Sequence, residues 1–271
     1  LIPSGTSVYD IKNEVINDLS IVEERKKENI LLLGWNPRIL RVVQELNNYI
    51  KSTSHIDIVA NLPQPQVLEN YASDSLTELN FTYKQADTSS RKALEELNIF
   101  QYDYVMLFSY DLNDIQKSDS ITLITLLHIR DMCDRAGKSL NVVSEMLDIK
   151  NRELAEVTNA DDFIVSDKML SLLITQVSEN KDLMRVFEDI LNEKGSEIYM
   201  KPISNYIQLD IEVNFYTLIE AAQRKGHTAI GYRIMQDKHN IEKAYGVVIN
   251  PDKSKNILFA PEDKLIVLAE D

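Results

Sequence analysis

Residues 30–38 read Ile30-Leu31-Leu32-Leu33-Gly34-Trp35-Asn36-Pro37-Arg38. The first five form a short apolar run that ends in glycine, which is typical of a strand buried on both faces of a parallel sheet. Apolar residues then recur at helical spacing over 39–50, and Pro37 stands where a first helical turn tolerates a missing N–H. The stretch therefore predicts a strand, a tight turn and a helix.

Outward from this stretch, the same alternation continues to about residue 168. Further strands are expected at 56–60, 81–83, 104–108, 140–143 and 163–165, and further helices at 91–97 and 118–136. The second of these helices has Ser118 as its expected N-cap and Gly137 as its C-terminal stop. Because strand-helix-strand units pair in parallel through right-handed crossovers, the sequence predicts an α/β fold with a Rossmann-like, doubly wound parallel sheet.

The pattern changes beyond about residue 180. A helix is expected from Leu183 to Asn192, and short β-branched and aromatic stretches then surround one helix at 215–223, which indicates a smaller α+β lobe. The predicted organisation is a linker with a connecting helix at 1–28, an N-lobe at 29–180, a connecting helix at 181–195 and a C-lobe at 196–271.

The amino-acid composition indicates which partners and which cellular compartment to expect. The formal net charge of −14 opposes binding to phosphate backbones, so nucleic acid is not expected as a partner. The single cysteine, Cys133, allows no internal disulfide and fits a reducing cytoplasm. The apolar runs are far shorter than the roughly 20 residues that span a bilayer. Residues 1–5 do not resemble a signal peptide and do not begin with Met, so we expect a piece of a longer protein.

The turn after the first strand bears on dinucleotide binding. A nicotinamide fingerprint needs several glycines there and an acidic residue at the end of the second strand. Only Gly34 is present, and the second strand ends without a carboxylate, which argues against NAD. Gly34 and Arg38 remain the candidates for holding an anionic cofactor at the helix start. The sequence contains no nucleophile or metalloenzyme motif, so it does not predict an enzyme.

Acidic residues follow the fourth and fifth expected strands. Asp111 and Asp119 come after the fourth strand, and Glu145 and Asp148 lie at the end of the fifth. Because the carboxyl ends of parallel strands meet at one edge, these four side chains could converge on a hard cation such as calcium. Solvated loop acids and helix N-terminal charges would give the same pattern.

Several segments resemble the Castor and Pollux ion channel family. They are residues 30–35, the segment Lys117-Ser118-Asp119-Ser120 with the helix after it, Val142-Val143-Ser144-Glu145-Met146-Leu147-Asp148, and the later stretches 230–233, 249–255 and 263–267. The resemblance covers about residues 29–269. It extends to the wider group of domains that regulate potassium conductance, the RCK domains, whose two lobes are called TrkA-N and TrkA-C.

The resemblance implies a ring or dimer of such domains, fused to or docked on a membrane pore, with a ligand that opens it. Several relatives bind calcium. In a calcium-gated relative the site takes an aspartate and two glutamates; Asp119 and Glu145 match, whereas the second glutamate falls on Leu147 unless Asp148 substitutes. That departure weakens the expectation of a calcium site.

Three functions are therefore compared. The first is a cytoplasmic, ligand-sensing gating domain of a potassium or related cation channel, with the pore on the same or a partner chain. The second is a separate cytoplasmic regulatory subunit of a potassium transporter. The third, a nicotinamide-dependent oxidoreductase, lacks both the fingerprint and a proton-transfer group with an evident partner.

Overall fold

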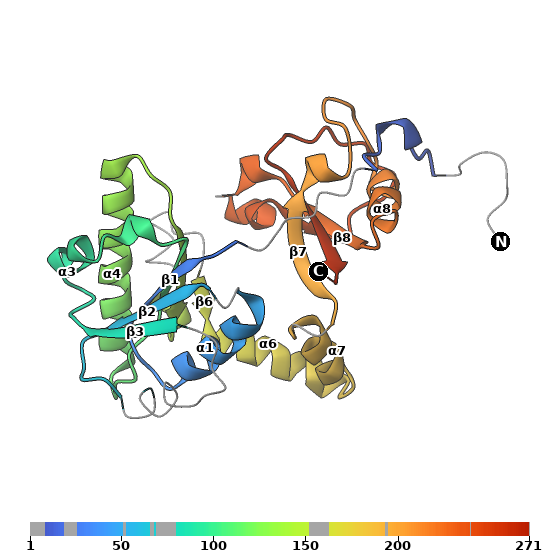
Figure 1. The fold of residues 1–271 in the computed structure, drawn as a ribbon. Helices are drawn as coiled ribbons and strands as arrows, with labels where there is room; N and C mark the ends of the chain where they lie inside the picture. The colour runs from blue at the N-terminus through green and yellow to red at the C-terminus, as the bar shows by residue number, and fades with distance from the viewer. Residues whose placement is uncertain are drawn as a thin grey trace. The chain divides into compact units, whose positions relative to one another are not determined.

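The computed structural model describes residues 9–18, 26–50, 53–65, 68, 80–151, 163–192, 195–238 and 240–270. The chain forms two compact units: Glu24–Asn180, and Leu1–Glu23 together with Lys181–Asp271. Figure 1 shows the elements of both. No helix in the described ranges is both long and apolar enough to cross a membrane.

The first unit contains the predicted six-stranded sheet. All of its strand pairs are parallel, and the order is β3-β2-β1-β4-β5-β6. The strands are β1 (Asn29–Leu33), β2 (His55–Ala60), β3 (Asn80–Gln85), β4 (Tyr104–Leu107), β5 (Asn141–Met146) and β6 (Phe163–Val165). The order reverses direction at β1, as in a doubly wound fold, so the predicted fold class is confirmed.

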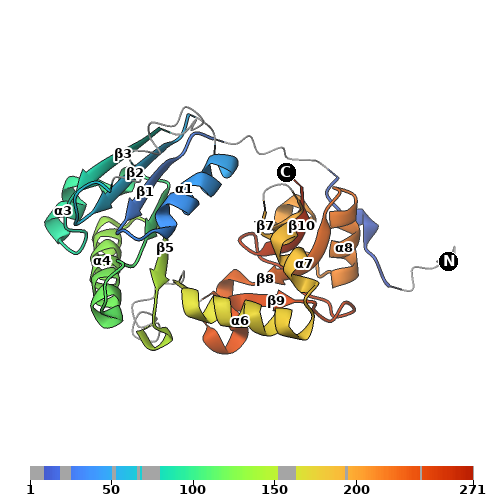
Figure 2. The ribbon, with the colours of Figure 1, turned by 90° about the horizontal axis from the view of Figure 1, so that it is seen from below.

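The apolar run of β1 is buried on both faces, as predicted. Leu31 and Leu33 belong to one core cluster, which includes apolar residues of α3 (Arg91–Glu96) and α4 (Ile115–Ala136). Ile30 and Leu32 belong to a second cluster, which includes Ile39 and Val43 of α1 (Arg38–Tyr49). Figure 2 shows α1 and α4 on opposite sides of this sheet. A short 3-10 helix, η2 (Ile99–Gln101), precedes β4.

Helix α4 begins earlier than its predicted N-cap. Its first residue is Ile115, and the Asp114 carboxylate accepts the backbone N–H of Lys117 at 3.1 Å. Ser118, the expected cap, lies inside the helix, where its hydroxyl donates to the Tyr110 carbonyl at 2.5 Å. The Asp114 side chain thus accepts one of the free N–H groups of the first turn, and the Ser118 hydroxyl bonds elsewhere. The helix ends at Gly137 as expected, with φ 60°.

Two helices follow β6. They are α6 (Ser166–Glu179), which the sequence did not single out, and α7 (Leu183–Ile190), which lies within the expected segment 181–195. Four apolar side chains of α6 are at least half exposed: Met169, Leu170, Leu172 and Ile174. Helix α6 belongs to the first unit and α7 to the second.

The second unit contains an antiparallel sheet and the helices α7 and α8. Its strand order is β7-β10-β8-β9. Its remaining elements are β7 (Glu197–Pro202), η3 (Ile203–Asn205), α8 (Phe215–Gln223), β8 (Thr228–Arg233), η4 (Met235–Asp237), η5 (Ile241–Gly246), β9 (Val247–Ile249) and β10 (Lys264–Ala269). The Asn214 side chain caps α8 by accepting the Thr217 N–H at 3.0 Å. The predicted smaller α+β lobe is therefore present.

The predicted connecting helix within 1–28 needs correction in the described residues. Residues 10–18 contain only a 3-10 helix, η1 (Asn13–Val15), and 26–28 are not helical. Val15 and Ile16 are buried in the core of the second unit, and Ile16 forms an antiparallel bridge with Ile207. Here the chain buries Val15 and Ile16 and forms a bridge to Ile207, where a helix would have formed helical hydrogen bonds. Residues 1–8 and 19–25 lie outside the described part.

Candidate functional site

The turn between β1 and α1 places Gly34 against Phe108, the residue after β4. Gly34 has φ 96°, and a Cβ atom built on it would lie 2.0 Å from the carbonyl oxygen of Phe108. Only glycine fits this conformation and this spacing. The close approach of neighbouring backbone therefore accounts for Gly34 without a ligand, and its predicted cofactor role stays a prediction.

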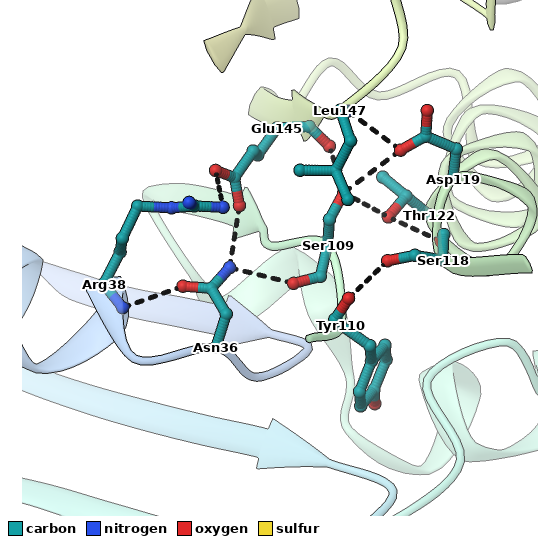
Figure 3. A network of polar contacts seen from close by, with 9 residues as sticks. All are labelled: Asn36, Arg38, Ser109, Tyr110, Ser118, Asp119, Thr122, Glu145 and Leu147. Carbon is teal, nitrogen blue, oxygen red and sulfur yellow. Dashed lines mark hydrogen bonds and ion pairs between the residues drawn. The ribbon is translucent and has the colours of Figure 1, made fainter. Parts of the chain in front are cut away.

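Asn36, in the same turn, is 2% exposed and joins three parts of the unit. Its Oδ1 accepts the Arg38 N–H at 2.9 Å, which closes an Asx turn at the start of α1. Its Nδ2 donates to the Ser109 carbonyl and to Glu145 Oε2, both at 2.8 Å. The side chain thus connects the start of α1 with the ends of β4 and β5, as Figure 3 shows.

Arg38 forms an ion pair with Glu145. The Nη2 of Arg38 lies 2.6 Å from Glu145 Oε1, and the side chains are 54% and 10% exposed, respectively. Glu145 is the last-but-one residue of strand β5, and Arg38 is the first residue of α1. Both oxygens of the Glu145 carboxylate therefore contact donors of the β1–α1 segment (Figure 3).

Asp119, on the buried side of α4, organises the loop after β5. Its Oδ1 accepts the Leu147 N–H at 2.9 Å, and its Oδ2 accepts the Asp148 N–H at 2.9 Å and the Asn151 Nδ2 at 2.8 Å. The residue is 1% exposed. A buried carboxylate is tolerated when hydrogen bonds of this kind replace its hydration.

Ser109 lies between the two carboxylate residues. Its hydroxyl donates to the Glu145 carbonyl at 3.0 Å and lies 3.4 Å from both Asp119 Oδ1 and Thr122 Oγ1. Asp119 and Glu145 thus meet at one edge of the sheet, as their positions after β4 and at the end of β5 predict. Figure 3 shows this network.

Asp111 and Asp148 do not complete a cation cage with them. Asp111 is exposed, and the Asp148 carboxylate accepts the Gln116 side-chain amide and the Lys150 N–H, each at 2.9 Å. Within the described ranges, no three acidic, histidine or cysteine side chains are grouped so that they could share one metal ion. The donor set does not fit a calcium ion as arranged, and the predicted calcium site gains no support.

On the other side of β1, Tyr110 lies at the same edge of the sheet and contacts the residue after β2. The Tyr110 hydroxyl accepts the Asn61 N–H at 2.8 Å and lies 3.1 Å from Thr88 Oγ1. Burial raises the pKa of the Tyr110 hydroxyl above its usual value. Asn61, which follows β2, supplies no carboxylate for a ribose.

A cleft of about 290 Å³ opens in the first unit beside this network. Its walls come from the start of α4, the loop after β5 and helix α6. The lining residues are Ile115, Leu147, Asp148, Ile149, Lys168 and Ser171. The Asp119 hydrogen bonds to Leu147 and Asp148 therefore also hold one wall of the cleft.

Sequence reasoning missed three polar side chains of this site. Asn36, Ser109 and Asn151 each contact or link the predicted carboxylates. An asparagine two residues before a helix start is a signal for an Asx turn, so the role of Asn36 could have been predicted from the sequence. Ser109 and Asn151 carry no comparable signal, because their partners are distant in the chain.

No family model matches the chain. A probable ion channel named POLLUX from Arabidopsis thaliana is 28% identical over 280 residues, which cover 89% of this chain and 33% of that protein. The chain resembles the Castor and Pollux ion channels. The ion channel DMI1 of Medicago truncatula is 26% identical, with 89% and 31% covered, and the probable ion channel CASTOR of Oryza sativa is 22% identical, with 92% and 31% covered. The predicted resemblance to Castor and Pollux channels is confirmed, and the chain spans about a third of the length of these relatives.

Two solved structures are only distantly similar to the chain. A nucleoside-diphosphate-sugar epimerase from Agrobacterium tumefaciens matches 48% of this chain and 41% of its own, at 14% identity and a TM-score of 0.34. An NADH-dependent reductase matches 47% of this chain and 62% of its own, at 15% identity and a TM-score of 0.31. Similarity at this level carries no argument about function, whereas the Castor and Pollux relatives are named as ion channels.

Proposed function

We propose that this chain is a regulatory domain of an ion channel, lies in the cytoplasm and changes the conduction of a pore formed by another part of the same protein or by a partner chain. The observation that carries the proposal is the similarity over about nine-tenths of the chain to Castor and Pollux channels three times its length. The conducted ion is proposed to be potassium or a related cation, from the family resemblance.

The site supports a regulatory role because it joins elements that are far apart in sequence. The β1–α1 turn, the end of β4, the start of α4 and the loop after β5 meet through Asn36, Ser109 and Asp119. A ligand or a neighbouring domain that contacts one of these elements would shift the others, and the cleft beside Leu147 is the proposed place of contact.

The test is a potassium-flux measurement on the full-length protein in liposomes. We expect Asp119→Asn to change the flux at unchanged protein content, and Asp134→Asn, at an exposed position of the same helix, to leave it unchanged. Equal flux in wild type and Asp119→Asn would reject a regulatory role for this edge. Potassium flux that requires a separately encoded membrane protein would favour the transporter-subunit alternative.

The chain is also proposed to self-associate, as a dimer or ring. Ile124 and Leu127 on α4, the helix singled out from the sequence, are each 43% exposed, and α6 carries the four exposed apolar residues described above. Exposed apolar surface of this kind is typical of contact sites. Light scattering should give a mass above 31.1 kDa, and Leu127→Glu should lower it. A monomer at all concentrations would reject this proposal.

A further inference from the structure

We propose that Arg38 supplies the positive charge that pairs with Glu145. This ion pair within the chain then stabilises this edge of the sheet, and no calcium ion binds there. The resemblance to channel domains implies a calcium site that includes Asp119 and Glu145. The donors around these two carboxylates instead come from the protein. The inference concerns the isolated chain, so its failure would leave the proposed channel role standing.

The burial of Glu145 requires a cationic partner. The residue is 9% exposed, and a buried carboxylate without compensation is strongly disfavoured. Arg38 supplies the charge at 2.6 Å, and Asn36 donates to the second oxygen at 2.8 Å. Because the Arg38 side chain is 54% exposed, it keeps much of its hydration while it neutralises Glu145.

Three N–H donors of the protein already occupy most of the Asp119 carboxylate. A carboxylate offers about four lone-pair sites in total. Asp119 Oδ1 faces the Leu147 N–H at 2.9 Å and the Ser109 hydroxyl at 3.4 Å. Its Oδ2 faces the Asp148 N–H and the Asn151 amide. A calcium ion would have to displace these N–H donors, which would lose their partners in a buried setting.

Leu147 and its possible substitute, Asp148, also offer no third side-chain ligand. Leu147 supplies a backbone N–H to Asp119 rather than a side-chain oxygen. Asp148, the substitute, directs its oxygens to Gln116 and Lys150. Calcium takes six to eight oxygen ligands, so the remaining set is too small.

The first measurement is a calcium titration of the wild-type chain by calorimetry and thermal unfolding. At roughly 10 mM calcium chloride, about tenfold above the weakest protein sites, a bound ion would raise the unfolding midpoint by about 3 °C or more. We expect no heat of binding and a shift no larger than magnesium chloride produces. A calcium-specific shift that Glu145→Gln abolishes would overturn the proposal.

The second measurement compares Arg38→Met with Arg41→Met, an exposed arginine of the same helix. We expect Arg38→Met to lower the unfolding midpoint by about 3–8 °C and Arg41→Met to leave it nearly unchanged. In a Glu145→Gln background the effect of Arg38→Met should fall by at least half, because the charge that it pairs is gone. Equal effects of the two substitutions, or an undiminished effect in that background, would refute the assignment. If Arg38→Met does not fold, Arg38→Lys in the same cycle and the wild-type titration decide.

Discussion

The carboxylate of Asp119 in helix α4 accepts the backbone N–H of Leu147, the residue that follows strand β5, at 2.9 Å. The bond joins a helix to a loop that begins 28 residues later, and the same carboxylate holds the next amide, of Asp148. Asp119 therefore holds the conformation of one wall of the cleft.

Asp119→Asn should destabilise the first unit by about 2 kcal/mol, because one amide group cannot accept from two backbone N–H groups and Asn151 together. Urea unfolding, followed by the fluorescence of Trp35, the single tryptophan, measures the change in this unit. The exposed control Asp134→Asn should change the free energy of unfolding by less than about 0.5 kcal/mol. Similar losses for both variants would show that the Asp119 bonds contribute little.

Asn36→Asp should be more damaging than its small change in size suggests. The substitution replaces the buried Nδ2, which donates to Glu145 and to the Ser109 carbonyl, with an oxygen that repels both. We expect a loss of about 3 kcal/mol in the free energy of unfolding. Asn113→Asp, in the exposed loop before α4, serves as control and should be near neutral. A stable Asn36→Asp protein would contradict the buried network.

Gly34→Ala and Gly137→Ala separate steric fit from backbone conformation. Both glycines have positive φ, but a Cβ atom on Gly34 meets Phe108 O at 2.0 Å, whereas nothing lies within 4 Å of one on Gly137. We expect losses of about 1 kcal/mol at Gly137 and about 3 kcal/mol or more at Gly34. Thermal unfolding of the two variants side by side checks the order, and a smaller loss at Gly34 would contradict the close approach of β1 and β4.

Asp57 makes the first unit sensitive to acid. Burial by itself would raise the pKa of Asp57, but hydrogen bonds from Thr82 and from Tyr102 at 2.6 Å, with the nearby His55, outweigh it and lower the pKa below 3.8. A carboxyl group with a depressed folded-state pKa stabilises the protein above its unfolded-state pKa, and this stability is lost as the pH falls through the folded-state pKa. The loss should therefore begin near pH 4 and grow below it.

Tyr102→Phe tests this linkage. The variant should be less stable than wild type by about 1–2 kcal/mol at pH 7, and the difference should shrink below pH 4, where Asp57 becomes protonated in both proteins. Urea unfolding at pH 7 and pH 3 measures both differences. Tyr104→Phe, at an exposed position two residues later, should show no such pH dependence. A difference that is constant with pH would assign the effect of Tyr102 to packing alone.

The sequence by itself determined the fold class and the edge at which the site lies. A run of four apolar residues at 30–33 that ends in glycine is typical of a strand buried on both faces of a parallel sheet, and the alternation of strands and helices then predicts which strand ends meet. The sequence therefore allowed Asp119 and Glu145 to approach each other, although solvated loop acids would have shown the same pattern. The resemblance to Castor and Pollux channels was also readable from the sequence, because it rests on the order of short motifs.

Only the tertiary structure decided how the polar side chains pair. Asn36 and Glu145 are 109 residues apart, and nothing local in either segment indicates that they share a hydrogen bond. The partner of Arg38 is likewise not encoded locally. Its exposed position on α1 is compatible with a solvated charge or an ion pair, and the position of β5 decides for the ion pair. Local patterns encode burial and backbone conformation, whereas side-chain pairing depends on distances of a few ångströms between elements, which packing of the whole unit sets.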